Sequence, residues 1–81
     1  MHKVYVLRSL KDGNLYIGCT KNLDKRIMMH KGGKVRSTKS RLPVELIYKE
    51  EHADIYEAFK KERFYKTPGG KKKLLEKLGN S

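Results

Sequence analysis

Residues 3–20 read KVYVLRSLKDGNLYIGCT, and this stretch decides the fold. The segment from Lys3 to Leu10 is rich in valine, tyrosine and leucine, as strands are. Asp12-Gly13-Asn14 is a strong turn signal, and Leu15 to Cys19 again has the composition of a short strand. The two segments therefore predict a β-hairpin at the start of the chain.

The hairpin brings polar and small residues to one face of the predicted sheet. In an antiparallel pair closed by an even-numbered loop, Tyr5 and Tyr16 point to the same side. Gly18 lies on that side too, where the missing side chain lets a ligand approach the backbone. The alternative is structural, since tyrosine is common in strands and often packs with its hydroxyl group at the edge.

The rest of the sequence predicts helices and one further strand. Gly32-Gly33 and Thr67-Pro68-Gly69-Gly70 break the pattern, and Asp54 with Glu57 has the spacing of a capping box. In chain order we expect a helix at 22–31, a basic loop at 34–41, a strand at 44–49, a helix from 54 to about 66, and a short basic helix at 71–78. The prediction is one α+β domain over residues 1–81, a small three-stranded antiparallel sheet flanked by helices in the order ββαβαα.

Charge is the main guide to partners. The chain has 20 Lys and Arg against 9 Asp and Glu, a formal net charge of +11. Such an excess attracts polyanions, and nucleic acid is the first candidate because phosphate contacts supply most non-specific affinity. No membrane contact is expected, because the sequence has no tryptophan and no strongly amphipathic helix with bulky apolar anchors. Cys19 is the single cysteine, which excludes an internal disulfide and favours the reducing cytoplasm.

Three ionisable side chains stand at positions where apolar ones are expected. In the helix from residue 54, Ile55, Ala58 and Phe59 form a stripe, and Glu62 falls in the middle of it. A carboxylate there must pair with a cation, bind a metal or stay protonated. Arg26 and His30, four residues apart, lie on one side of the preceding helix.

The structural alternatives remain open for each of these side chains. They are a Glu62–Lys salt bridge, an arginine that reaches the surface, and a histidine satisfied within the core. Together with the two phenols, however, the set supplies a base, a phosphate clamp and a metal ligand for phosphodiester hydrolysis.

The order of these motifs resembles a known nuclease family. Val4-Tyr5-Val6 followed by Leu15-Tyr16-Ile17-Gly18 is similar to the paired signature of the GIY-YIG nucleases. The resemblance continues through residues 22–26, 30, 43–48 and 57–62, and is strongest to the small stand-alone bacterial members. The first tripeptide departs from the family, with Lys3-Val4 before the tyrosine, and Cys19 stands where some relatives carry a basic residue.

The resemblance implies an enzyme that hydrolyses phosphodiester bonds with one divalent ion, Mg²⁺ or Mn²⁺. It implies that Glu62 holds the metal, that Arg26 contacts the scissile phosphate, and that Tyr5 and Tyr16 are the signature tyrosines. It favours DNA over RNA. The general base stays open between Tyr16 and His30, because a free phenol has a pKa of about 10 and a free imidazole about 6.5.

Exposed basic segments are expected to add phosphate contacts, and their alternative is a solvated charge run. These residues are Lys34, Arg36, Lys39, Arg41, Lys71, Lys72 and Lys73. The sequence contains no zinc-finger or helix-turn-helix pattern, so we expect structure-selective or single-strand-selective cleavage rather than strong sequence specificity. Two other functions remain open: a non-catalytic basic nucleic-acid-binding protein, and a module that binds an acidic protein.

Overall fold

A three-stranded antiparallel sheet runs through the middle of the molecule in the computed structural model, which describes residues 1–79. Its strands are β1 (His2–Ser9), β2 (Leu15–Thr20) and β3 (Val44–His52), in the spatial order β2-β1-β3. The helices are α1 (Leu23–Lys31), α2 (Arg36–Lys39), α3 (Ile55–Tyr65) and α4 (Pro68–Gly79). The predicted α+β class is confirmed. The last two residues of the expected domain, 80 and 81, lie outside the described part.

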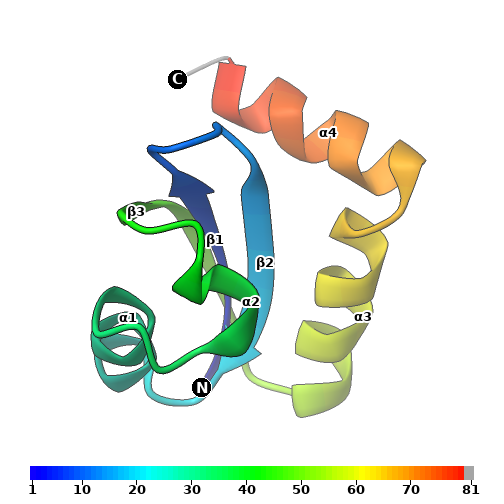
Figure 1. Ribbon diagram of the computed structural model, residues 1–81. Helices are drawn as coiled ribbons and strands as arrows, with labels where there is room; N and C mark the ends of the chain where they lie inside the picture. The colour runs from blue at the N-terminus through cyan, green and yellow to red at the C-terminus, as the bar shows by residue number, and fades with distance from the viewer. Residues whose placement is uncertain (80–81) are drawn as a thin grey trace.

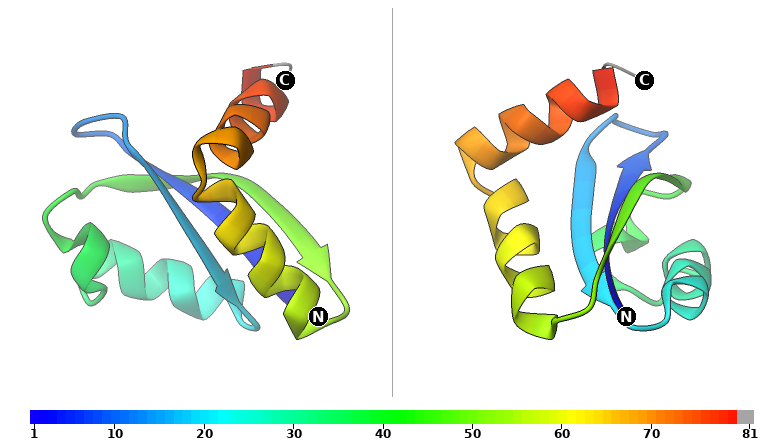
Figure 2. Two further views of the ribbon diagram at one scale, coloured as in Figure 1. Left: turned by 90° about the vertical axis from the view of Figure 1, so that its right-hand side faces the viewer. Right: turned by 180° about the vertical axis from the view of Figure 1, so that it is seen from behind.

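Helices cover both faces of the sheet, which is seen nearly edge-on in Figure 1. On one face Tyr5 and Leu7 pack with Leu23 of α1. On the other face Val4 and Val6 pack against α3 and α4. The same arrangement is visible from behind in Figure 2, where β3 lies between α1 and α3. The alternation of β1 thus sends its odd-numbered residues toward one layer and its even-numbered residues toward the other.

The hairpin register confirms the predicted parity. Tyr5 faces Gly18 across the ladder, and Leu7 faces Tyr16, so both tyrosines lie on the α1 side. The strands differ slightly from their predicted bounds, and β3 continues three residues further than expected, to His52. A register shift between Val6 and Leu7 accommodates the pairing of β1 with β3.

The expected loop at 34–41 is wrong in its middle, because it contains the short helix α2. The Val35 carbonyl accepts hydrogen bonds from the backbone of Thr38 and Lys39, which closes one helical turn. Thr38 is completely buried and holds this turn against α1. Four residues are too few to give a helical period in the sequence.

The start of α4 is also corrected. The Thr67-Pro68-Gly69-Gly70 segment ends α3, but it opens α4 as well, because the Thr67 hydroxyl accepts from the Gly70 backbone at 3.0 Å and Pro68 takes the first helical position. A Cβ at Gly70 would lie 1.7 Å from the Phe64 carbonyl oxygen. The glycine therefore allows α4 to turn closely against the end of α3.

The buried side of α3 is rotated from the predicted stripe. Ala58 and Tyr65 are fully buried, whereas Ile55 and Phe59 are 38% and 45% exposed. Glu62 lies at the border of the buried side, 20% exposed. The capping prediction holds for Asp54, whose side chain accepts from the Tyr56 backbone, while Glu57 pairs with Lys60 instead of returning to the cap.

No helix within residues 1–79 is long and apolar enough to cross a membrane.

Candidate active site

A pocket of about 440 Å³ opens along β2, the edge strand that lies between the α1 and α3 layers. The structure brings all five predicted catalytic side chains to its wall: Tyr5, Tyr16, Arg26, His30 and Glu62. Helix α1 supplies Arg26 and His30 from one side of the strand, and α3 supplies Glu62 from the other. Gly18 and Lys71 also line the pocket, together with Lys66.

Tyr5, His30 and Thr38 form a buried hydrogen-bonded chain on the α1 side of the pocket. The Tyr5 hydroxyl lies 3.1 Å from Nε2 of His30, and Oγ1 of Thr38 lies 2.7 Å from Nδ1. Burial, and then the charge of Arg26, lower the pKa of His30, so the ring is neutral near pH 7. Thus His30 is satisfied within the core while one edge of it reaches the pocket wall. Thr38 gave no sequence signal, because its role depends on α2.

Gly18 makes room for Tyr5. A Cβ at this position would lie 2.4 Å from the Tyr5 hydroxyl oxygen, so the ring crosses over its partner in the ladder. We expected the missing side chain to open the backbone to a ligand. Instead, the space that the glycine leaves is filled by the Tyr5 ring of the protein itself. The position of the Tyr5 hydroxyl depends on this glycine.

Glu62 has a partner within its own helical segment. Nζ of Lys66 donates to Oε2 of Glu62 at 3.1 Å, with the lysine 54% exposed. The pairing matches the structural alternative for Glu62, yet both side chains also line the pocket. Lys66 was missed in the sequence, although the i, i+4 spacing from Glu62 is a recognisable signal.

Arg26 brings uncompensated positive charge to the pocket. Within residues 1–79 it forms no ion pair with a carboxylate. Burial raises the pKa of Tyr5, and the charge of Arg26 lowers it while that of Glu62 raises it. Burial also raises the pKa of Cys19, with a further contribution from Glu62, which keeps the thiol neutral. A phosphate group is the natural ligand for such a guanidinium.

The other predicted DNA contacts are exposed and lie outside the pocket wall. They are Lys34, Arg36, Lys39, Arg41, Lys72 and Lys73. Arg41 pairs with Asp12 at 3.2 Å near the hairpin turn, which gives it a structural partner.

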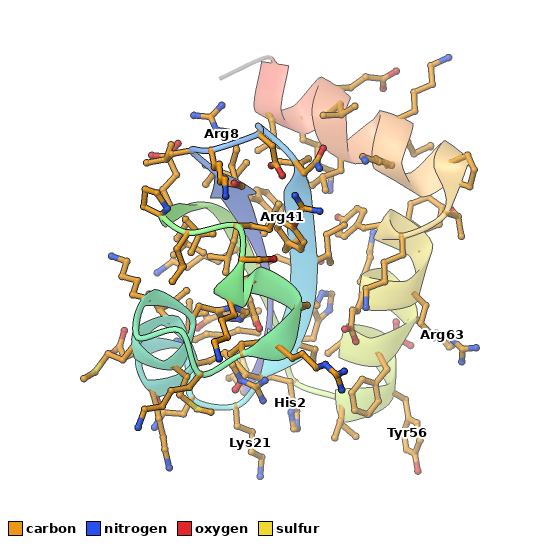
Figure 3. All side chains as sticks on the ribbon, viewed as in Figure 1. His2, Arg8, Lys21, Arg41, Tyr56 and Arg63 are labelled. Atoms are coloured by element: carbon orange, nitrogen blue, oxygen red, sulfur yellow. The ribbon has the colours of Figure 1, made fainter. Side chains whose placement is uncertain are left out.

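On α3, Tyr56 and Arg63 point away from the sheet (Figure 3).

The donors in the pocket fit a hard divalent ion. No group of three or more His, Cys, Asp or Glu side chains within residues 1–79 could hold a metal alone. Mg²⁺ typically takes one or two carboxylates and completes its octahedral shell with water and substrate phosphates. One carboxylate in the same pocket as a guanidinium that has no carboxylate partner within residues 1–79 agrees with that preference. The neutral Cys19 thiol offers no thiolate for a softer metal.

Behind the pocket, a carboxylate-centred network links β3 to α3 and α4. Tyr65, which also lines the pocket, donates to Glu50 at 2.6 Å, and Tyr48 donates to the same oxygen at 2.9 Å. His52 bonds to the other oxygen of Glu50, and Nζ of Lys77 donates to the Tyr65 hydroxyl. Burial and the bonds to Glu50 raise the pKa of each phenol to about 12. The network fixes the end of α3, one turn beyond Glu62.

Comparison with known proteins identifies the family of the chain. The model of the GIY-YIG catalytic domain matches residues 1–75 of the chain. The chain belongs to the GIY-YIG family. The two tyrosine motifs that name the family are the ones that meet across the β1–β2 ladder.

Bacterial relatives match most of the chain. A UPF0213 protein of Staphylococcus saprophyticus is 42% identical over 90% of this chain and 89% of its own length. A UPF0213 protein of Bacillus pumilus is 47% identical over 91% of this chain and 76% of its own length. The solution NMR structure of a UPF0213 protein from Bacillus halodurans has a TM-score of 0.58 and 33% identity, covering 93% of this chain and 82% of that one.

Proposed function

We propose that this GIY-YIG protein is a metal-dependent endonuclease that hydrolyses phosphodiester bonds of DNA. The observation that carries the proposal is one pocket, along the edge strand β2, that gathers the two signature tyrosines, one guanidinium and one carboxylate. A shallow site on the edge of a sheet suits a polymer, which can lie across β2 without a chain end entering a deep cavity. We place its preference with branched or single-stranded DNA rather than with a particular base sequence.

Arg26 would stabilise the charge that develops on the phosphate during in-line attack of water. Glu62 would hold the metal, Mg²⁺ or Mn²⁺. When bound, this ion would supply positive charge beside the non-bridging and leaving oxygens. Lys66 and Lys71, on the same wall, would bind phosphates next to the scissile one.

The two candidate bases differ in access to water. Both ring nitrogens of His30 are engaged, by Tyr5 and Thr38, and the residue is 4% exposed. Tyr16 is half-buried and lines the open pocket on the strand edge. We therefore assign proton acceptance from water to Tyr16, and a positioning role to His30.

The test compares wild type with Glu62→Gln on plasmid, single-stranded, branched and RNA substrates, with Mg²⁺ or Mn²⁺ and with EDTA. Cleavage should need the metal and should disappear in Glu62→Gln, while nucleic-acid affinity measured in EDTA persists. Glu57→Gln is the matched control on the exposed side of α3. Equal cleavage by wild type and Glu62→Gln would refute the metal site.

A non-catalytic basic binder is the second candidate, and the Glu62–Lys66 pair favours it because it neutralises the carboxylate without a metal. This candidate predicts salt-dependent binding of the same substrates with no cleavage under any metal condition. The same substrate panel distinguishes the two functions.

A further inference from the structure

We infer that Thr38 is a positioning residue: it donates to Nδ1 of His30, holds the ring in the Nε2–H tautomer, and so leaves the hydroxyl proton of Tyr5 free to point into the pocket. The consequence for hydrolysis rests on the proposed function. The tautomer itself is a property of the free protein and can be measured without any activity.

The direction of the first bond follows from the partners of the Thr38 hydroxyl. Oγ1 lies 2.7 Å from Nδ1 of His30, whereas its contact with the Val35 carbonyl oxygen is 3.5 Å long. Good O–H···O hydrogen bonds span about 2.5–3.0 Å, so the carbonyl is a poor acceptor for this proton. Thr38 is completely buried, and leaving a buried donor without a good acceptor destabilises the folded state. The proton therefore goes to Nδ1.

The tautomer then follows by elimination. A neutral imidazole has one N–H and one acceptor nitrogen. If Nδ1 accepts from Thr38, Nε2 carries the hydrogen and donates to the Tyr5 oxygen at 3.1 Å. Within residues 1–79, every buried side-chain nitrogen and oxygen has a partner, which this assignment preserves.

The assignment decides what Tyr5 offers to a ligand. Because its oxygen accepts from His30, its own proton is not used by the ring, and Tyr5 is one of the residues that line the pocket. A hydroxyl that already accepts a hydrogen bond is a stronger donor. Tyr5 would then donate to an anionic phosphate oxygen, whereas the opposite tautomer would present only its lone pairs and repel that oxygen.

The two family tyrosines thereby acquire different tasks from their surroundings. Tyr5 is 3% exposed and has its oxygen fixed by His30, so it acts as a donor. Tyr16 lies at the open strand edge and remains free to accept a proton from water. Helix α2 acts through this chain, since it delivers Thr38 to the ring from eight residues beyond His30.

The first experiment is NMR on the metal-free, ¹⁵N-labelled wild-type protein near pH 7.5. Long-range ¹H–¹⁵N correlations of an imidazole distinguish its protonated nitrogen from its unprotonated one. The His30 signals are assigned by their loss in His30→Gln, which separates them from those of His2 and His52. We expect protonated Nε2 and unprotonated Nδ1. A protonated Nδ1 in the wild type would overturn the inference.

The second experiment compares Thr38→Val, which removes the hydroxyl at nearly constant shape, with Thr38→Ser, which keeps it. The Nδ1 resonance of Thr38→Val should move toward that of an imine nitrogen without a hydrogen bond, and Thr38→Ser should keep the wild-type position. The kcat for cleavage should fall roughly three- to tenfold in Thr38→Val and recover in Thr38→Ser, with metal affinity unchanged.

An unchanged Nδ1 resonance in folded Thr38→Val would refute the role of Thr38. If Thr38→Val does not fold, the wild-type tautomer and the Thr38→Ser resonance still decide the question. Absence of cleavage in every protein, with the expected tautomer present, would reject the proposed function and leave the Thr38–His30–Tyr5 assignment intact.

Discussion

The ammonium group of Lys66 lies 3.1 Å from the carboxylate of Glu62, at the position where the proposed metal ligand faces the pocket. A lysine there supplies the charge that a divalent ion would supply. Lys66 is 54% exposed, so its long side chain can leave the carboxylate at little cost. The Glu62–Lys66 ion pair should therefore lower the affinity for a metal only slightly.

Replacing Lys66 should strengthen metal binding. In Lys66→Met the competing cation is gone, and affinity for Mn²⁺ should rise roughly twofold to fivefold, the range expected for an exposed ion pair. Titration calorimetry or the EPR signal of free Mn²⁺ measures the change. Lys60→Met is the matched control, because Lys60 pairs with Glu57 elsewhere on α3. Equal affinities for Lys66→Met and wild type would contradict the competition between Lys66 and the metal for Glu62.

Tyr16→Phe tests whether Tyr16 is the general base of the proposed reaction. Loss of the hydroxyl should lower kcat by two orders of magnitude or so, within the usual contribution of a general base, while substrate affinity changes little. Tyr56→Phe, on the outer face of α3 and 71% exposed, is the control phenol. Full activity in Tyr16→Phe combined with complete loss in His30→Ala would reverse the assignment of roles.

Adding a methyl group at Gly18 should disturb Tyr5. The new Cβ would lie 2.4 Å from the Tyr5 hydroxyl, so the ring must move. We expect Gly18→Ala to lose about 1–3 kcal/mol of unfolding free energy and most of the activity. Chemical denaturation and cleavage rates give the two values. Gly69→Ala, where nothing lies within 4 Å, should change neither by a comparable amount.

Salt dependence tests the basic segment at the start of α4. Replacing Lys71, Lys72 and Lys73 together with alanine should flatten the plot of log affinity against log salt, by about 0.9 per lost phosphate contact on duplex DNA. Lys71, which lines the pocket, should account for the largest single share. The experiment is a binding titration in EDTA at several salt concentrations. An identical slope would mean that these lysines make no phosphate contacts and are simply solvated surface residues.

Ionised Glu50 should stabilise the folded state at pH values above the range in which it takes up a proton. Its burial alone would raise its pKa, but bonds from Tyr65, His52 and Tyr48 outweigh that effect and lower the pKa below 4.5. The folded state therefore binds its proton less readily than the unfolded chain. The resulting stabilisation is complete above about pH 4.5 and is lost as the pH falls through the folded value.

Glu50→Gln should consequently unfold with a weaker dependence on pH in the acid range, as thermal denaturation between pH 3 and 7 would measure. Glu51→Gln, an exposed neighbour that pairs with Lys3, should retain the wild-type acid profile. A Glu50→Gln profile parallel to that of the wild type would contradict the network.

Local patterns predicted the parts of this fold that depend on neighbours in sequence. The hairpin, its parity and the ends of α1 follow from alternation and turn residues. The strand order does not, because pairing of β3 with β1 is a long-range choice. Helix α2 is too short to show a period, so its buried Thr38 stayed hidden.

The candidate site was accessible because unusual polar residues mark it. Arg26 and Glu62 stood out by interrupting apolar stripes, and both line the pocket. The predicted apolar stripe of α3 is wrong in part, because Ile55 and Phe59 are partly exposed whereas Ala58 is fully buried. Lys66 was overlooked because one more lysine carries little information in a chain with 20 basic residues.

The pairing of Tyr5 with Gly18 has a final consequence for how this chain can vary. Deleting or inserting a single residue between the two rings, within the paired part of β1 or β2, would place one ring on the opposite layer and separate the two phenols even though neither had been replaced. The chain would then still contain every functional group of the site, but the groups would no longer lie together in one pocket. The alternation of the strand residues that carry the two tyrosines is therefore as necessary to the site as the rings themselves.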